Sequence, residues 1–169
     1  MMSEGIKLKL FPYQVDIVKQ FGKRGGRLIS IEDTGAGKTI IALSLIKAYK
    51  FKRALIISKS LILEDGFMTA LENFDYFESL DIARYQTGKP VDKNKGLMLS
   101  YGQIKGANTK QLGSFDCLIL DEVHLVKNSS GSTWKELSKL ISKYNPKARY
   151  LTAAPVSYTH LTLPTILLV

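Results

Sequence analysis

The sequence has very little cysteine and histidine. Its 169 residues include one cysteine, Cys117, and two histidines. A single cysteine excludes a disulfide framework within the chain, and so small a set of soft ligands excludes a zinc site. Cys117 stands inside the apolar run 117–120. We interpret it as a small core residue without a disulfide partner, in a protein of a reducing cytoplasmic interior, whether bacterial, phage or host cell.

The sequence also lacks a long hydrophobic run and a secretory signal peptide. The apolar stretch at the C-terminus is interrupted by Pro164 and is too short to span a bilayer, so no membrane partner is expected. Charge is uneven, because 24 Lys and Arg residues against 15 Asp and Glu residues give a net charge of +9. This positive charge is scattered along the chain. Nucleic acid is therefore a natural partner, although charge alone does not decide it.

The chain is long enough for one domain with its own core and too short for two. Short apolar runs alternate with amphipathic stretches. Strands are expected at 27–31, 54–57, 82–85, 97–99, 115–120 and 149–152, and helices at 11–21, 40–50, 61–74 and 132–144. This alternation predicts an α/β fold with a doubly wound, mainly parallel sheet and helices on both faces. Polar residues follow most of the apolar runs, where ligands gather in such sheets.

The most informative motif is EDTGAGKT, residues 32–39, between an apolar strand and an apolar helix. Its two glycines let the backbone N–H groups point inward, Lys38 offers a positive charge to the β- and γ-phosphates, and Thr39 offers a hydroxyl to Mg²⁺. The helix that follows adds its positive dipole end. A full phosphate loop has glycine where Glu32 stands, so a glycine turn without a ligand is the alternative. The predicted nucleotide-binding residues here are Asp33, Thr34, Gly35, Ala36, Gly37, Lys38 and Thr39.

A second motif, DEVH at residues 121–124, follows the apolar run 117–120. A carboxylate at the tip of a buried strand can hold nucleotide-bound Mg²⁺, and the next carboxylate can orient or deprotonate the attacking water. Asp121 is therefore the predicted metal residue, with Thr39, and Glu122 is the predicted base. Lys38, Asp121 and Glu122 form the predicted catalytic set, ATP and Mg²⁺ are the predicted cofactors, and His124 is expected at the nucleotide site. The alternatives are an acidic pair that caps a strand and a structural histidine.

Together these motifs resemble the first RecA-like lobe of a superfamily-two helicase of the SWI/SNF type, close to the annealing-helicase branch. The resemblance covers about residues 8–155. That family also lacks the leading glycine of the phosphate loop, and DEVH resembles its DEAH box. LFPYQ, residues 10–14, resembles the family's segment before the phosphate loop, which implies that Gln14 reads the adenine. An exposed glutamine on a helix is the alternative.

Three further segments resemble motifs of this family that act on DNA. ISKS at 57–60 and LSY at 99–101 are similar to motifs that touch the DNA backbone, although both can also be plain strand ends. LTAAP at 151–155 is similar to the motif that couples hydrolysis to DNA, from which its two alanines depart. The resemblance implies DNA-binding or coupling roles for Lys59, Ser60, Ser100, Tyr101 and Thr152.

The resemblance implies the N-terminal ATP-binding lobe of a DNA-dependent ATPase or translocase that moves along or remodels duplex or branched DNA. Two alternatives stay open. One is the lobe of a phage or restriction-type nucleic-acid helicase. The other is a nucleotide- or DNA-binding module without turnover.

The last residues differ from the rest of the chain, because 156–169 contain no Lys, Arg, Asp or Glu. VSYTHLTLPT, residues 156–165, resembles the in-frame translation of a transposon-end adapter used to prepare sequencing libraries. We expect residues 1–155 to be the helicase ATP-binding domain and 156–169 to be a non-native tail, with a natural divergent tail as the alternative. The second RecA-like lobe, which supplies an arginine finger in the resembling family, is absent from the printed sequence. The chain is therefore expected to bind ATP with little turnover.

Overall fold

Short runs rich in Ile and Leu form the centre of the fold, a six-stranded sheet in the order β1-β6-β5-β2-β4-β3. The computed structural model describes residues 6–107, 109–128 and 131–155, so the predicted tail at 156–169 lies outside the described residues. Every neighbouring pair of strands is parallel, which confirms the predicted α/β fold. The strands are β1 (Arg27–Ile31), β2 (Ala54–Ser58), β3 (Ile82–Arg84), β4 (Gly96–Ser100), β5 (Cys117–Leu120) and β6 (Ala148–Ala153).

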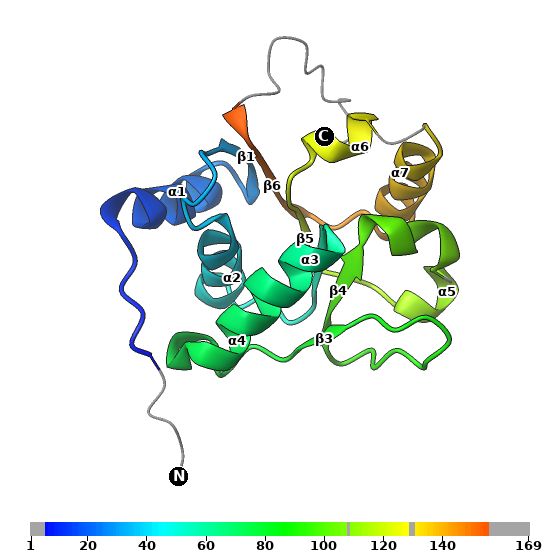
Figure 1. The fold of residues 1–169 in the computed structure, drawn as a ribbon, viewed down its shortest axis with the longest axis horizontal. Helices are drawn as coiled ribbons and strands as arrows, with labels where there is room; N and C mark the ends of the chain where they lie inside the picture. Colours follow the sequence, from blue (N-terminus) through cyan, green and yellow to red (C-terminus); the bar gives the residue numbers. More distant parts are fainter. Residues whose placement is uncertain (1–5, 108, 129–130, 156–169) are drawn as a thin grey trace.

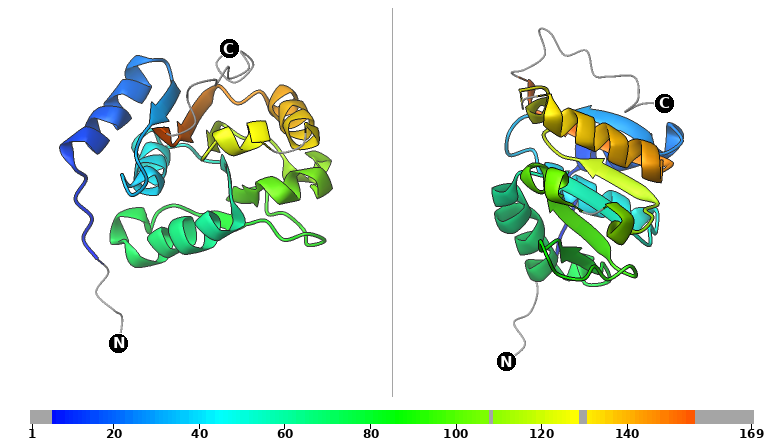
Figure 2. Two further views of the ribbon diagram at one scale, coloured as in Figure 1. Left: turned by 45° about the horizontal axis from the view of Figure 1, so that its top comes forward. Right: turned by 90° about the vertical axis from the view of Figure 1, so that its right-hand side faces the viewer.

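Helices cover both faces of this sheet (Figure 1), and the turned view at the left of Figure 2 again has α1 and α2 on one side of the strands and α7 on the other. Alternate strand residues supply the two cores, since Ile56 packs with the first set of helices and Leu55 with the second. The first set is α1 (Pro12–Lys23), α2 (Lys38–Ala48), α3 (Ser60–Ile62), η1 (Leu63–Met68), α4 (Thr69–Asn73) and η2 (Asp75–Phe77). The second set is η3 (Tyr101–Gly106), α5 (Thr109–Leu112), α6 (His124–Asn128) and α7 (Ser132–Tyr144).

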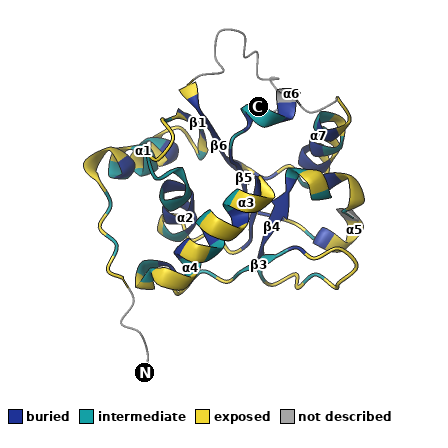
Figure 3. Ribbon diagram, in the orientation of Figure 1, coloured by how far each residue is buried: buried dark blue, intermediate teal, exposed yellow. Residues whose placement is uncertain are grey.

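Burial follows the position of each strand in the sheet (Figure 3). β2, β4, β5 and β6 are buried at every residue, because each has a strand on both sides and helices on both faces. The sequence also predicts a buried strand at 27–31, and this is wrong in part. Arg27 and Ile31 are exposed, since β1 lies at the edge of the sheet beside β6.

The helix expected at 61–74 forms, but it contains a π-helical turn, η1, with Gly66 inside it. Gly66 lies against the start of α2, where a Cβ on it would stand 3.3 Å from the Thr39 Oγ1 atom. Glycine therefore allows η1 to approach the residue predicted to bind Mg²⁺. The short helices η2, η3, α5 and α6 were not predicted, because segments of three to six residues are too short to show helical periodicity.

Cys117 is a core residue, as predicted. It is 1% exposed in β5, and burial, with a smaller contribution from Asp116, raises the pKa of its thiol. A buried thiol of this kind is chemically inert. In the part of the chain that the structure describes, no helix combines the length and the apolar character needed to cross a membrane.

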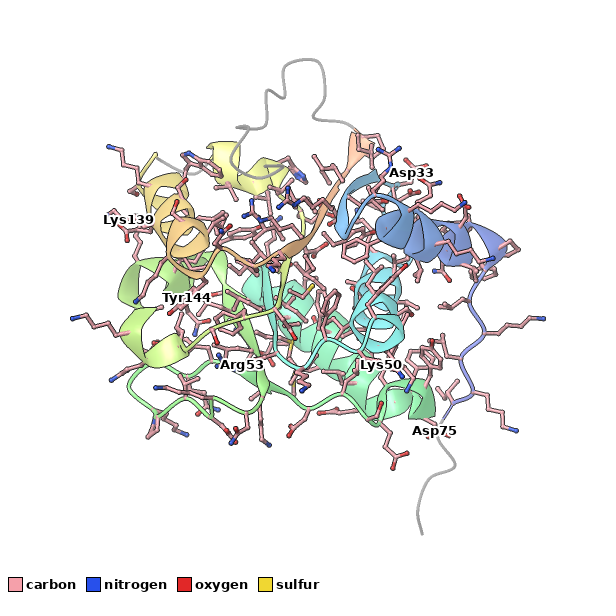
Figure 4. The ribbon with its side chains drawn as sticks, turned by 180° about the vertical axis from the view of Figure 1, so that it is seen from behind. Asp33, Lys50, Arg53, Asp75, Lys139 and Tyr144 are labelled. Carbon is pink, nitrogen blue, oxygen red and sulfur yellow. The ribbon has the colours of Figure 1, made fainter. Side chains whose placement is uncertain are left out.

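Arg53 holds together the connections at the amino ends of the strands (Figure 4). Its guanidinium donates hydrogen bonds to the carbonyls of Lys95, Ser114 and Leu112. It also lies over the ring of Phe115, with 4.3 Å between the guanidinium carbon and the ring centroid. Burial lowers the pKa of this guanidinium. A buried cation held by several carbonyl dipoles is costly to remove, because each carbonyl then loses its partner.

We expect Arg53→Met to lower the free energy of unfolding by about 2–4 kcal/mol, because the carbonyls lose hydrogen bonds from a charged donor. Arg27→Met is the matched control, since Arg27 is exposed and donates one hydrogen bond of 3.5 Å to the Lys147 carbonyl. Its expected change is within about 0.5 kcal/mol. Urea unfolding of the two variants at 25 °C measures the difference, and equal losses would contradict the anchoring role of Arg53.

Candidate nucleotide-binding site

The carboxyl ends of the parallel strands bring the predicted site residues to one edge of the sheet. The phosphate loop, residues 32–37, follows β1, and Thr152 lies near the end of β6. Asp121 follows β5, Lys59 follows β2 and Tyr101 follows β4. Because β6 and β5 come next to β1 in the sheet, Thr152 and Asp121 are the strand-end residues closest to the loop. Figure 4 marks this edge with Asp33, at the opposite end of the strands from Arg53.

The phosphate loop owes its curled shape to glycines with positive φ. Gly35 has φ 87° and Gly37 has φ 74°, left-handed values that side chains with a Cβ rarely adopt. A Cβ on Gly37 would also lie 2.5 Å from the amide nitrogen of Gln14. The loop leads directly into α2, which begins at Lys38. Loop and helix N-terminus together form a cradle suited to an anion such as phosphate.

Gln14 joins α1 to the phosphate loop. It is 4% exposed, so the alternative of an exposed glutamine is wrong. Its Nε2 atom donates to the Ala36 carbonyl at 3.3 Å, and its Oε1 atom accepts from the Phe11 N–H at 3.0 Å. The Tyr13 hydroxyl donates to the same Ala36 carbonyl at 2.6 Å. The position of Gln14 beside the loop fits a role at the nucleotide, and the reading of adenine stays a prediction.

Lys38 and Glu122 form an ion pair between the two predicted motifs. The distance from Lys38 Nζ to Glu122 Oε1 is 2.7 Å, and Lys38 Nζ also donates to the Glu32 carbonyl at 3.3 Å. His124 Nδ1 lies 3.2 Å from the other carboxylate oxygen of Glu122. The side chains of Lys38 and Glu122 are only 10% and 12% exposed, so their charges balance each other in a largely desolvated position.

The backbone of Glu122 is strained. Its φ is 52°, in the left-handed region, which costs a residue with a Cβ about 1–2 kcal/mol. The residue follows β5 directly, and this turn directs its carboxylate toward Lys38. Strain of this kind persists where the surroundings enforce it, and such positions cluster at functional sites.

Asp121 is a buried carboxylate whose two oxygens each accept a hydrogen bond from a hydroxyl. Thr152 Oγ1 donates to Oδ1 at 2.6 Å, and Ser58 Oγ donates to Oδ2 at 2.7 Å. Burial raises the pKa of Asp121, and Glu122 adds to the increase, while the two hydroxyls and Lys38 oppose it. A positive charge arriving nearby would favour the charged form of this carboxylate, as Lys38 does, and so oppose the effect of burial.

Two residues predicted to act in DNA binding or coupling, Thr152 and Tyr101, contact the turn at 121–122. Thr152 Oγ1, besides its bond to Asp121, accepts from the Glu122 N–H at 3.0 Å. The Tyr101 hydroxyl donates to the Asp121 carbonyl at 2.8 Å. Burial, together with the charges of Asp121 and Glu122, raises the pKa of Tyr101 well above its usual value. Both side chains are therefore placed to transmit changes to the nucleotide site, and their contact with DNA stays a prediction.

The other predicted DNA-binding residues differ in exposure. Lys59 is exposed at the end of β2. The Ser60 hydroxyl accepts from Arg84 at 2.9 Å, and the buried Ser100 hydroxyl donates to Gln103 Oε1 at 3.1 Å.

The structure adds residues to which the sequence assigned no individual role. Ser58 contacts Asp121, whereas Arg84 and Gln103 lie outside the nucleotide site, farther along the same edge of the sheet. The spacing from Ser100 to Gln103 is that of a capping box, which is present in the structure and was readable from the sequence. Arg84 carried no such pattern, because it ends a strand of three residues.

A magnesium site at this edge would be built from few protein ligands. Among the described residues, no group of three or more His, Cys, Asp or Glu side chains could hold a metal ion. Mg²⁺ at nucleotide sites needs only one or two protein ligands, since phosphates and waters complete its shell. The buried carboxylate of Asp121 and the hydroxyl of Thr39 at the start of α2 are compatible with that chemistry.

The family described as "Type III restriction enzyme, res subunit" (ResIII) matches residues 7–157. Among curated proteins, the chain is similar to the human "DNA annealing helicase and endonuclease ZRANB3", with 26% identity over 164 residues that cover 91% of this chain. The mouse protein of the same description is 25% identical over 166 residues. The chain spans about 15% of the length of these relatives.

Solved structures share the fold. The "Sulfolobus solfataricus SWI2/SNF2 ATPase core in complex with dsDNA" superposes with a TM-score of 0.78 at 18% identity, over 96% of this chain and 36% of that one. The "UvsW helicase from Bacteriophage T4" gives a TM-score of 0.71 at 15% identity, over 95% and 56% of the two chains. These similarities confirm the predicted fold of a first RecA-like lobe.

We expect Thr152→Val to lower the free energy of unfolding by about 1–3 kcal/mol, because it removes a donor to Asp121 and the acceptor of the Glu122 N–H. Thr152→Ser is the matched control, since it retains the hydroxyl that makes both bonds. Chemical denaturation of the two variants measures the effect. Equal stability of Val and Ser variants would show that these bonds contribute nothing.

The raised pKa of Asp121 predicts a pH-dependent stability difference. In the folded state its acid form is favoured, so its contribution to stability is fully present below the unfolded pKa and is lost as pH rises through the folded pKa. Asp121→Asn removes that loss. The variant should therefore gain stability relative to the wild type as pH rises from 4.5 to 8, in buffer without nucleotide or divalent ions. Urea unfolding across this range tests it, and a difference that stays constant or shrinks with pH would contradict the burial argument.

Proposed function

The chain belongs to the family described as type III restriction enzyme, res subunit, and from this premise we propose that residues 1–155 form the N-terminal ATP-binding lobe of a DNA-dependent ATPase. The parent enzyme would use ATP to move along or remodel duplex or branched DNA. One observation carries the proposal. The lysine of the phosphate loop, Lys38, contacts Glu122, which stands beside the buried Asp121 at the edge where ligands bind in parallel sheets.

The ion pair of Lys38 with Glu122 suggests how nucleotide binding prepares hydrolysis. The phosphate loop and the first turn of α2 would bind the phosphates through backbone N–H groups. Lys38 would then exchange its carboxylate partner for the phosphate oxygens. Glu122 Oε1 would become available to orient or deprotonate the attacking water, while His124 stays close to Oε2.

Thr39 and Asp121 are the residues that we propose to hold Mg²⁺. When bound, the ion would neutralise charge on the phosphate oxygens. The chain's own contribution is to fix the carboxylate of Asp121, through the hydroxyls of Thr152 and Ser58. Gly66 leaves room for Thr39 beside η1.

DNA is the nucleic acid that we propose for the strand ends after β2 and β4. The relatives are described as DNA annealing helicases, and one similar structure is described as a complex with dsDNA. The net charge of +9 supports binding to phosphates. Lys59, which adjoins Ser60 directly after β2, is an exposed basic side chain that could meet a DNA phosphate. We also retain a reducing cytoplasmic compartment as part of the proposal, because the one cysteine is a buried core residue.

The lobe of a phage or restriction-type nucleic-acid helicase is the second candidate. It is favoured by the match to a restriction-enzyme family and by the similarity to the phage UvsW fold. A nucleotide-binding module without turnover is the third. The nucleic acid that stimulates hydrolysis distinguishes these candidates.

In the full-length parent, we expect ATP hydrolysis to be stimulated by duplex DNA and lowered about 100-fold or more by Lys38→Ala or Glu122→Gln. Lys38→Ala should also weaken nucleotide binding, whereas Glu122→Gln should leave it nearly unchanged, because of these two side chains only the lysine is proposed to contact phosphate. Lys139→Ala, on the exposed face of α7, is the control and should retain full activity. Steady-state kinetics with DNA, RNA and no nucleic acid provides the measurement.

Stronger stimulation by RNA than by DNA would favour the second candidate. Absence of turnover in the parent would favour the binding module and contradict the proposed ATPase. For the printed chain, nucleotide binding that is weakened by Lys38→Ala is the expected result.

A further inference from the structure

Arg84 is the centre of a hydrogen-bonded cluster at the outer part of the carboxyl edge. It ends β3, the edge strand farthest from the phosphate loop. Each of its nitrogens donates to a different side chain: Nη2 to Ser60 Oγ at 2.9 Å, Nε to Glu64 Oε1 at 2.8 Å, and Nη1 to Gln103 Oε1 at 3.0 Å. Arg84 therefore joins the segment after β2 to the segment after β4.

The segment after β2 connects Arg84 to the nucleotide site. Ser60, which accepts from Arg84, stands two residues beyond Ser58, whose hydroxyl donates to Asp121 Oδ2 at 2.7 Å. The same segment continues into η1, which carries the carboxylate partner of Arg84 and places Gly66 against Thr39. Movement of this segment would therefore reach both proposed magnesium ligands.

The segment after β4 makes a second connection. Gln103 Oε1 accepts from the Ser100 N–H at 3.0 Å and from the Ser100 hydroxyl at 3.1 Å, besides its bond from Arg84. Tyr101, the next residue, donates to the Asp121 carbonyl at 2.8 Å. Arg84 is thus linked to Asp121 in two ways. One link runs through Ser60 and Ser58, and the other runs through Gln103 and Tyr101.

The engagement of Arg84 argues for a positioning role instead of a direct phosphate contact. Its side chain is 14% exposed, and its charge is balanced by Glu64. A planar guanidinium can hold three acceptors in fixed directions, whereas the flexible ammonium of lysine cannot. Lys59, next to Ser60, is exposed and is better placed to meet a phosphate.

We propose that Arg84 couples nucleic-acid binding to the nucleotide site, an inference that rests on the proposed function. Nucleic acid that binds the segments 57–60 and 99–101 would change their relative position. Because Arg84 ties them together, both would move as one unit, and Ser58 and Tyr101 would carry the change to Asp121. Without Arg84 each ligand would still bind, but neither would affect the other.

The test compares coupling with affinity in the full-length parent. The dissociation constant of a fluorescent ATP analogue with Mg²⁺ is measured with and without saturating duplex DNA, and that of the DNA with and without nucleotide. In the wild type, each ligand should change the affinity of the other by the same factor, about 5- to 150-fold. Arg84→Met and Arg84→Lys should bring this factor to about 1–2, with each separate affinity changed less than about 3-fold.

Arg27→Met is the matched control, because Arg27 is an exposed arginine on the opposite edge strand, and it should keep the wild-type factor. Gln103→Met removes the acceptor that links Arg84 to Ser100 and should reproduce the loss. It also decides the outcome if Arg84 variants do not fold. DNA-linked turnover, measured alongside, should lose its stimulation while the rate without DNA remains.

The outcomes separate the inference from the function on which it rests. A wild type whose ATP hydrolysis is not stimulated by DNA contradicts the proposed function itself. A wild type that DNA stimulates, but in which DNA and nucleotide bind independently, overturns the inference alone. A wild type with coupling that Arg84→Met or Gln103→Met retains overturns the role of Arg84. Loss of DNA affinity at unchanged coupling would show that Arg84 contacts phosphate directly, and this also overturns the inference.

Discussion

The buried carboxylate of Asp121 is the constraint on which the rest of the site depends. A charge at 3% exposure is unfavourable, and burial accordingly raises its pKa. It is tolerated because hydroxyls of Thr152 and Ser58 donate to its oxygens from the strands on either side of β5. Hydrogen bonds to a charged group contribute about 1.5–3 kcal/mol each. The parallel order β6-β5-β2 is what delivers both donors to one point.

The same arrangement links the two kinds of binding expected at this edge. The contacts on one side of Asp121 lead to Lys38 through Glu122, and those on the other lead to Arg84 through Ser58 and Tyr101. Lys38, Glu122 and Asp121 contact one another or shared partners there, so a ligand that takes one partner changes the others. A set of parallel strand ends thereby becomes a site in which nucleotide and nucleic acid can affect each other.

Local patterns in the sequence were sufficient for much of this account. Each strand was found from an apolar run, α7 was predicted at 132–144 and is observed there, and the glycines at 35 and 37 marked a loop that does adopt positive φ. The contacts of Arg84 were not predictable, because they depend on the order β2-β4-β3, and a sequence does not state the order of strands. The exposure of Arg27 and Ile31 in β1 was not predicted, because the sequence does not show that β1 lies at the edge of the sheet. The contact of Tyr101 with Asp121 was not predictable either, because β4 and β5 follow each other in the sequence but are separated by β2 in the sheet.

A structure of the chain with a non-hydrolysable ATP analogue and Mg²⁺ would test the central claim most directly. We predict that Lys38 Nζ leaves Glu122 for the phosphates, that Gln14 stays beside the phosphate loop, and that Asp121 keeps its hydrogen bonds from the hydroxyls of Thr152 and Ser58. A nucleotide bound away from the carboxyl edge of the sheet, or an unbroken pair of Lys38 with Glu122 beside bound phosphates, would contradict it.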